Sequence, residues 1–198
     1  PRDRRIGGPG VVEAVKRHAL AQPDITFNIW AEGRLVHAWR AATPEQRIQD
    51  VLGSGLSNQS VVASSDTAGL SVRGHVGVTD VARARADLQY VYINGRYVRD
   101  RLIAHAVRAA FDDVLHGARQ PAYVLYVTLD PARVDVNVHP TKIEVRLRDG
   151  RDVHLAVQRA VEHALAAPRV AQNPAQGLGV DGNRVAQGKS AGSPAVHS

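Results

Sequence analysis

The sequence predicts an α+β fold in which a mixed β-sheet is covered mainly on one face by helices. Two amphipathic segments, residues 101–116 and 151–166, show helical spacing, and they lie among segments whose apolar residues alternate or run continuously, as in strands. The chain has 198 residues and is 44% hydrophobic, which is enough to bury a core. It contains no cysteine, so disulfide frameworks, cysteine-ligated metals and cysteine nucleophiles are excluded.

The first half of the chain alternates helix signals with short strand signals. Thr43 is placed to cap a helix, with Pro44 at the first helical position and Gln46 completing a capping box. In chain order, the expected elements are a helix over 11–21, strands over 24–30 and 35–39, a helix that ends near residue 52, and strands over 61–63 and 70–76. A charged, irregular connection is expected to follow.

The second half of the chain is patterned more clearly. Asn94-Gly95 is a strong turn signal after a strand over 88–93, and Asp100 is placed to cap the helix for which Gly117 is the predicted stop. Three further strands and a last helix are expected over 122–129, 134–138, 143–147 and 151–166. The aromatic residues of these apolar stripes are expected in the core rather than stacked on bases: Tyr92, Phe111, Tyr123 and Tyr126.

Composition divides the chain into three parts. Residues 1–10 are interpreted as a flexible segment and residues 11–167 as the folded domain. Residues 168–198 are rich in Ala, Gly, Pro, Gln and Ser and are predicted to be a disordered linker, because they offer little apolar surface to offset the entropy of ordering. A literal GxGxxG at 177–182 lies in this linker without a preceding strand, so it does not indicate a dinucleotide site. The chain has no Met, and it is interpreted as a piece of a longer protein.

The basic charge of the chain is spread unevenly. The net charge is +6, but residues 1–10 and 168–198 each carry +2, which leaves +2 for residues 11–167. An argument for nucleic-acid binding therefore depends on where the arginines of the folded domain cluster. The clearest cluster is Arg96, Arg99 and Arg101, which surround a single acidic residue, Asp100.

Three segments carry the strongest functional signal: QYVYINGRYVRDRLIAHAV at 89–107, QPAYVLYVTLDP at 120–131 and VDVNVHPTKIEVRL at 134–147. Their motifs, order and spacing strongly resemble the MutL family of DNA mismatch-repair proteins. In that family an xNGRxxRD motif begins a helix and a DVNVHPxKxEVRF-like segment follows. Leu147 stands where an aromatic residue is common, which is a minor departure. The resemblance extends more weakly from about residue 11 to about residue 166.

The resemblance implies a fold and a place in a larger protein. MutL proteins begin with an ATP-binding subdomain, continue with a ribosomal protein S5-like subdomain, and end with a linker and a dimerisation domain. This chain resembles the S5-like transducer subdomain with the start of the linker. The ATP-binding motifs are missing from it, so we expect ATP hydrolysis to belong to the longer protein and this chain by itself to be inactive.

The resemblance also implies roles for the second motif. The family's motif lysine, Lys142 here, enters the ATP site and contacts the γ-phosphate, where a compact ammonium on a loop is well suited to reach a terminal phosphate. The loop around it is expected to be shaped by Asn137, His139, Pro140 and Thr141, because proline fixes its own φ and biases the preceding residue toward extended backbone. No metal ligand is expected in this chain.

The arginine cluster is expected to bind DNA. By resemblance, Arg101 belongs to a DNA-binding groove, and Arg99 and Arg96 are weaker candidates beside it. Arginines in the first turn of a helix are not favoured by the helix dipole, so a role other than helix stability is plausible on physical grounds. The alternative is a solvated face with an ion pair between Arg101 and Asp100.

The family further implies cofactors, partners and location. These are ATP with Mg²⁺ in the longer protein, DNA, the mismatch-recognition protein MutS, a downstream nuclease or helicase, a homodimer formed through other regions, and a cytoplasmic location near the nucleoid. Two other functions stay open from the residues alone. One is a nucleic-acid-binding module without nucleotide function, and the other is a domain that docks repair partners.

Overall fold

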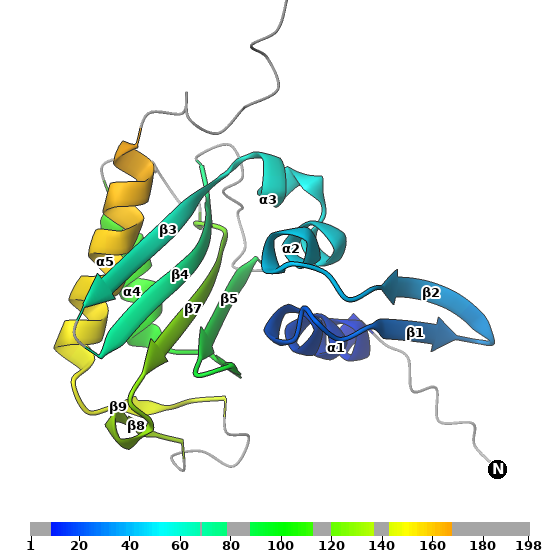
Figure 1. The fold of residues 1–198 in the computed structure, drawn as a ribbon, viewed down its shortest axis with the longest axis horizontal. Coiled ribbons are helices and arrows are strands. Elements are labelled where there is room, and N and C mark those ends of the chain that lie inside the picture. The colour runs from blue at the N-terminus through cyan, green and yellow to red at the C-terminus, as the bar shows by residue number, and fades with distance from the viewer. Residues whose placement is uncertain (1–8, 68, 79–87, 113–119, 137–142, 168–198) are drawn as a thin grey trace, which may run out of the picture. The chain divides into compact units, whose positions relative to one another are not determined.

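The computed structural model describes residues 9–67, 69–78, 88–112, 120–136 and 143–167. Figure 1 shows the fold. The elements in chain order are α1 (Pro9–Ala21), β1 (Phe27–Ala31), β2 (Arg34–Trp39), α2 (Pro44–Leu52), α3 (Ser54–Asn58), β3 (Ser60–Thr67), β4 (Leu70–Gly77), β5 (Gln89–Ile93), β6 (Arg96–Val98), α4 (Arg101–Ala110), β7 (Tyr123–Leu129), the 3₁₀ turn η2 (Pro131–Arg133), β8 (Val134–Asp135), β9 (Arg146–Leu147) and α5 (Gly150–Ala166). None of the described helices is long and apolar enough to cross a membrane.

A five-stranded sheet forms the centre of the fold, with strand order β3-β4-β7-β5-β6. Strand β5 runs parallel to β7, whereas the other neighbours in this sheet are antiparallel. The sheet is therefore mixed, and the predicted α+β class is confirmed. The parallel pair β5–β7 lies next to the β5–β6 hairpin, so the arginine-rich turn is held at one edge of the sheet.

Helices α4 and α5 pack side by side against one face of the sheet, as expected (Figure 1). Their apolar stripes meet the strand residues that point to this face, so Ile103 and Val157 join Val72 and Leu125 in one core cluster. Phe111 follows α4 and is fully buried in the same cluster. This face holds the larger of the two core clusters.

The opposite face of the sheet carries a second core that the sequence did not predict. Helices α1 and α2 cover it, and Leu20 and Ile48 pack there with Tyr90, Tyr92 and Val124. Tyr90 and Tyr92 are buried and Tyr126 is half-buried, and two of their hydroxyls also connect the sheet to α1. The hydroxyl of Tyr92 donates to the carbonyl of Arg17 at 2.8 Å, and the hydroxyl of Tyr126 donates to that of Leu20 at 2.9 Å. The expectation that the aromatic residues lie in the core is confirmed.

Strands β1 and β2 form a hairpin that pairs with no other described strand (Figure 1). A two-residue turn joins them, and both of its residues have positive φ, 51° at Glu32 and 74° at Gly33. Trp30 pairs with Leu35 across the hairpin and is 64% exposed. The hairpin thus presents apolar side chains that the described residues leave uncovered.

Several elements differ from the sequence predictions. Thr43 caps α2 as expected, but the side chain of Gln46 donates to Asp50 at 2.8 Å instead of returning to the cap, because a partner one turn ahead competes for it. The sequence prediction did not include the short elements α3, β6 and η2. It also extended the helix that begins at residue 101 to residue 116, whereas α4 ends at Ala110. The strands predicted over 134–138 and 143–147 are described only as the two-residue strands β8 and β9. Gly117 and the linker 168–198 lie outside the described residues.

Candidate functional site

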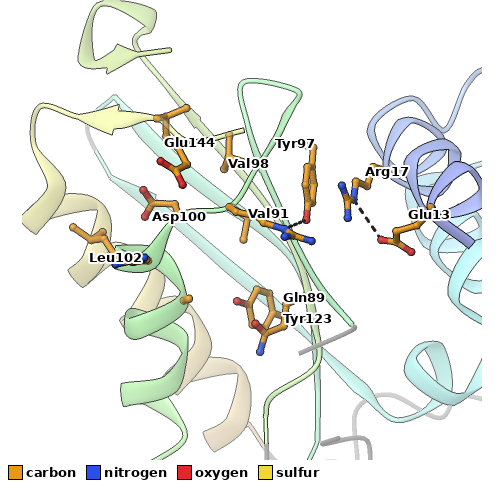
Figure 2. A pocket seen from close by; sticks show the side chains of 15 residues that line it. Glu13, Arg17, Gln89, Val91, Tyr97, Val98, Asp100, Leu102, Tyr123 and Glu144 are labelled. Atoms are coloured by element: carbon orange, nitrogen blue, oxygen red, sulfur yellow. Dashed lines mark hydrogen bonds and ion pairs between the residues drawn. The ribbon is translucent and has the colours of Figure 1, made fainter. Parts of the chain in front are cut away.

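A cleft of about 1330 Å³ lies where α1, the β5–β6 hairpin, the start of α4 and residues 143–145 meet. Figure 2 shows its side chains: Glu13 and Arg17 come from α1, Tyr97 lies between them and the sheet, and Asp100 and Glu144 lie on the opposite wall. Tyr123 from β7 also lines the cleft. Residues from both predicted motifs therefore share one cavity.

The turn at Asn94-Gly95 positions the first motif. Both residues have positive φ, 49° and 78°, the geometry of a tight hairpin turn, and strand β6 pairs back onto β5 directly after it. The side-chain oxygen of Asn94 also accepts a hydrogen bond from the backbone N–H of Leu129 at 3.0 Å. The turn is thereby tied to the end of β7. The sequence analysis did not include β6, although the Asn-Gly signal was available for it, because a tight hairpin turn requires a second strand.

Asp100 begins α4 and fixes the position of the arginines on either side of it. Its Oδ1 accepts a hydrogen bond from the backbone N–H of Ile103 at 2.9 Å, which is the predicted helix cap. Within the described residues, no ion pair joins Arg96, Arg99 or Arg101 to a carboxylate. Asp100 acts on the backbone, and Arg99 and Arg101 are exposed at the cleft.

The side chain of Tyr97 contacts two of the three arginines of the cleft. Arg99 donates from Nε to this hydroxyl at 3.3 Å, and the hydrogen bond raises the pKa of Arg99. The guanidinium of Arg17 lies over the Tyr97 ring, 4.5 Å from its centre, and its Nε is 3.4 Å from a carboxylate oxygen of Glu13. Glu13 in turn accepts from the hydroxyl of Tyr90 at 3.2 Å, and burial raises the pKa of Tyr90. Two arginines thus contact one aromatic side chain.

The second motif enters the cleft through its C-terminal end. The backbone N–H of Arg99 donates to the carbonyl of Ile143 at 2.7 Å, and Glu144 and Val145 line the cleft. Strands β8 and β9 pair on either side of residues 137–142, with Asp135 opposite Arg146. The predicted site residues of this loop lie outside the described residues: Asn137, His139, Pro140, Thr141 and Lys142.

Arg96 lies apart from the other two arginines. It lines a smaller hollow of about 270 Å³ together with Asn94, Pro131, Val134 and others, whereas the main cleft contains Arg99 and Arg101. The structure therefore brings two of the three predicted arginines together.

Among the charged and aromatic residues of the cleft, sequence reasoning did not single out Glu13, Arg17, Tyr97 and Glu144. The spacing of Glu13 and Arg17, four residues apart on a helix, was an available signal for an ion pair. It did not show which surface the pair would face.

The cleft carries three arginines, Arg17, Arg99 and Arg101, beside three carboxylates, those of Glu13, Asp100 and Glu144. Guanidinium groups bind phosphate oxygens through charge-assisted hydrogen bonds. Glu13 is engaged by Arg17 and Tyr90, and Asp100 by the start of α4, so these carboxylates are already partly occupied. The part of the chain that the structure describes contains no group of three or more His, Asp or Glu side chains that could hold a metal ion.

Comparison with known proteins identifies the family. A family model described as "DNA mismatch repair protein, C-terminal domain" matches residues 48–166. The DNA mismatch repair protein MutL of a Janthinobacterium species is 47% identical over 154 residues, which cover 78% of this chain and 25% of that protein. MutL of Xylella fastidiosa is 41% identical over 190 residues, which cover 95% of this chain and 30% of that protein. The chain thus spans about a quarter of the length of the curated relatives it matches.

Solved structures share the fold. The N-terminal domain of a DNA repair protein aligns with a TM-score of 0.63 at 19% identity, covering 84% of this chain and 54% of that one. A single-residue variant of the Aquifex aeolicus MutL ATPase domain aligns with a TM-score of 0.52 at 21% identity, covering 76% and 50%. These likenesses agree with the expected ribosomal protein S5-like fold. Because the family model matches more than half of this chain, the chain belongs to the MutL family of DNA mismatch repair proteins.

Proposed function

We propose that this chain is the transducer part of a MutL-type mismatch-repair ATPase and couples the state of a bound nucleotide to DNA binding. The observation that carries the proposal is the hydrogen bond from the Arg99 N–H to the Ile143 carbonyl, at 2.7 Å. It joins the arginine-rich turn to the residue that follows Lys142. A movement of the lysine loop would therefore act directly on the backbone between Arg99 and Arg101.

Lys142 is the nucleotide contact in this proposal. A loop lysine that contacts the γ-phosphate does so only when ATP is bound, because ADP has no γ-phosphate. Such a difference in contacts between the ATP and ADP states is what a switch requires. The surrounding residues Asn137, His139, Pro140 and Thr141 would shape the loop. The pairing of β8 with β9 supports this role, because it holds the two ends of the loop together.

Arg101 and Arg99 are the DNA contacts, with Arg96 in a supporting position. Phosphate contacts position a protein on DNA without reading the bases, so binding would be independent of sequence and sensitive to salt. The exposure of these arginines at the cleft, and the use of Asp100 as a helix cap, support the assignment.

ATP and Mg²⁺ would be held largely by other parts of the longer protein. The described residues offer cations for a triphosphate but no cluster of carboxylates for Mg²⁺. In this proposal the chain contributes Lys142, while MutS, a downstream nuclease or helicase and a second MutL subunit act through the whole assembly. A cytoplasmic location belongs to the same proposal.

The DNA assignment is tested by fluorescence anisotropy of this chain with a labelled duplex across a salt series. We expect Arg101→Glu to weaken binding and to lower the log–log salt slope by about 0.7–0.9 per lost phosphate contact. Arg34→Glu, which makes the same charge change on the exposed start of β2, is the matched control and should have a smaller effect. Equal effects of the two variants, or no binding of the unsubstituted chain at low salt, would contradict the DNA role and favour partner docking.

The nucleotide assignment is tested by ATP turnover of the full-length protein. Lys142→Ala should lower turnover by about tenfold or more, because a charged contact to the transferred phosphoryl group is lost. Lys16→Ala, which removes a lysine from α1, is the control for general loss of charge. If Lys142→Ala turns over ATP like the unsubstituted protein, the nucleotide-sensing role is wrong.

A further inference from the structure

Two histidines face each other across the seam between α4 and α5. Nδ1 of His105 lies 3.1 Å from Nε2 of His154, and the centres of the two rings are 5.4 Å apart. Because the nitrogens are within hydrogen-bond distance, one ring donates and the other accepts. Neither ring lines the cleft described above, so the pair is a separate feature of the molecule.

The two helices hold this pair in place. Gly150, the first residue of α5, lies one turn before His154. A Cβ added at Gly150 would lie only 2.9 Å from the Cδ1 of Leu102 on α4, so the two helices approach each other closely there. On the same two helices, Ala106 and Ala156 are buried in the core that the helices share with the sheet. The backbone positions of the two histidines are thus set by packed helices rather than by loops, while the ring of His105 is exposed and that of His154 is half-buried.

We propose that His105 and His154 form a two-histidine site for a divalent late transition-metal ion, of the class Zn²⁺, Ni²⁺ and Cu²⁺. Metal–imidazole bonds of about 2.0–2.1 Å at angles between square-planar and tetrahedral place two ligand nitrogens about 2.9–3.4 Å apart. The observed 3.1 Å falls within this range, so the two rings need only turn until both nitrogens point at one ion that takes the place of the shared proton. The ring that donates would move its proton to its other nitrogen, and a neutral pair would release no net proton.

The surroundings determine how strongly the ion is held. Arg101 and Arg108 on α4 and Arg151 on α5 lie about one turn from the histidines in sequence, and their charge opposes a cation, although salt screens it. Among the described residues no third histidine or carboxylate joins the pair in a metal-binding group. The ion would therefore keep open positions for water, and Cu²⁺ should bind most tightly because it leads the order of affinities for nitrogen ligands.

The test is a titration of this chain, freed of metal with EDTA and dialysed, with zinc sulfate. Binding is followed by the nitrogen shifts of the histidine rings in NMR spectra and, in parallel, by the thermal unfolding temperature. We expect the rings of His105 and His154 to shift together at one equivalent, and the unfolding temperature to rise because the ion binds only the folded chain. His105→Asn and His154→Asn should each lower the affinity by about tenfold or more.

A matched control uses the exposed His163 on α5, whose replacement by asparagine removes a histidine from the same helix and leaves the pair intact. His163→Asn should bind zinc like the unsubstituted chain. The proposal is overturned if zinc shifts other rings but not those of His105 and His154. It is also overturned if the two single variants bind zinc as tightly as His163→Asn does.

Discussion

Arg47 is fully buried in α2 although it carries a charge, and its guanidinium binds main-chain carbonyls instead of a carboxylate. Nη1 donates to the carbonyl of Ala19 at 3.2 Å, and Nη2 donates to those of Pro23, Ile25 and Arg40 at 2.9, 2.6 and 2.7 Å. These carbonyls lie at the end of α1 and on both sides of the β1–β2 hairpin. One side chain therefore fixes where the hairpin leaves and rejoins the folded domain.

Replacing Arg47 with methionine should lower the free energy of unfolding by about 2–4 kcal/mol, because several partly buried acceptors lose their donor. Urea denaturation followed by circular dichroism measures this loss. Arg40→Met is the matched control, since it removes an exposed side chain but keeps the carbonyl that Arg47 binds. A similar loss in both variants would show that the carbonyl contacts contribute little.

At the scale of elements, β4 can lie beside β7 only because position 74 is a glycine. Gly74 has a φ of 155°, and a Cβ built there would lie 2.0 Å from the carbonyl oxygen of Val124. The obstructing atom belongs to the backbone of a central strand, so it cannot move aside as the end of a flexible side chain would. The close approach of the two strands therefore depends on a missing side chain.

Gly74→Ala is expected to lower the free energy of unfolding by about 3 kcal/mol or more, as overpacking against a backbone atom does. Gly33→Ala in the β1–β2 turn is the control, because its φ is also positive, at 74°, but no atom lies within 4 Å of the added Cβ. That variant should lose only about 1–2 kcal/mol, the cost of the left-handed backbone. Denaturant unfolding of the two variants measures both losses of free energy. Equal losses would show that the added Cβ at position 74 does not clash with the carbonyl oxygen of Val124.

At the scale of the whole molecule, the two cores are joined through the tyrosines of the central strands. Tyr90, Tyr92 and Tyr126 face the core under α1 and α2, whereas Tyr123 faces the core under α4 and α5. Burial raises the pKa of all four phenols above the ordinary value. The folded state therefore favours the neutral phenols of both cores at the same time.

The sign of this effect predicts alkaline unfolding. A phenol with a raised pKa in the folded state stabilises the fold fully below its unfolded pKa of about 10, and this stability is lost as the pH rises beyond that value. We expect the ultraviolet absorbance of tyrosinate from these four residues to rise together with the loss of circular dichroism. A smooth rise of their absorbance near pH 10 with unchanged circular dichroism would contradict the prediction.

Local features of the fold could be predicted from the sequence because both partners lie close together in the chain. The caps at Thr43 and Asp100 and the turn at Asn94-Gly95 each involve residues within a few positions, and all three are confirmed. The apolar stripes of the last two helices likewise predicted that both pack on one face of the sheet, and α4 and α5 do share one core with it. The family motifs pointed to Arg99 and Arg101, and the structure shows them in one cleft.

The sequence by itself thus determined the α+β class, most elements and the family, because these depend on local spacing and on short motifs. Only the tertiary structure decided that Arg17 and Tyr97 complete the cleft, that Arg47 holds the hairpin, and that His105 meets His154. In each of these three contacts, the residues that meet come from different elements. These contacts form when the helices pack on the sheet. The periodicity of apolar residues within one segment does not show which other segment that segment will contact.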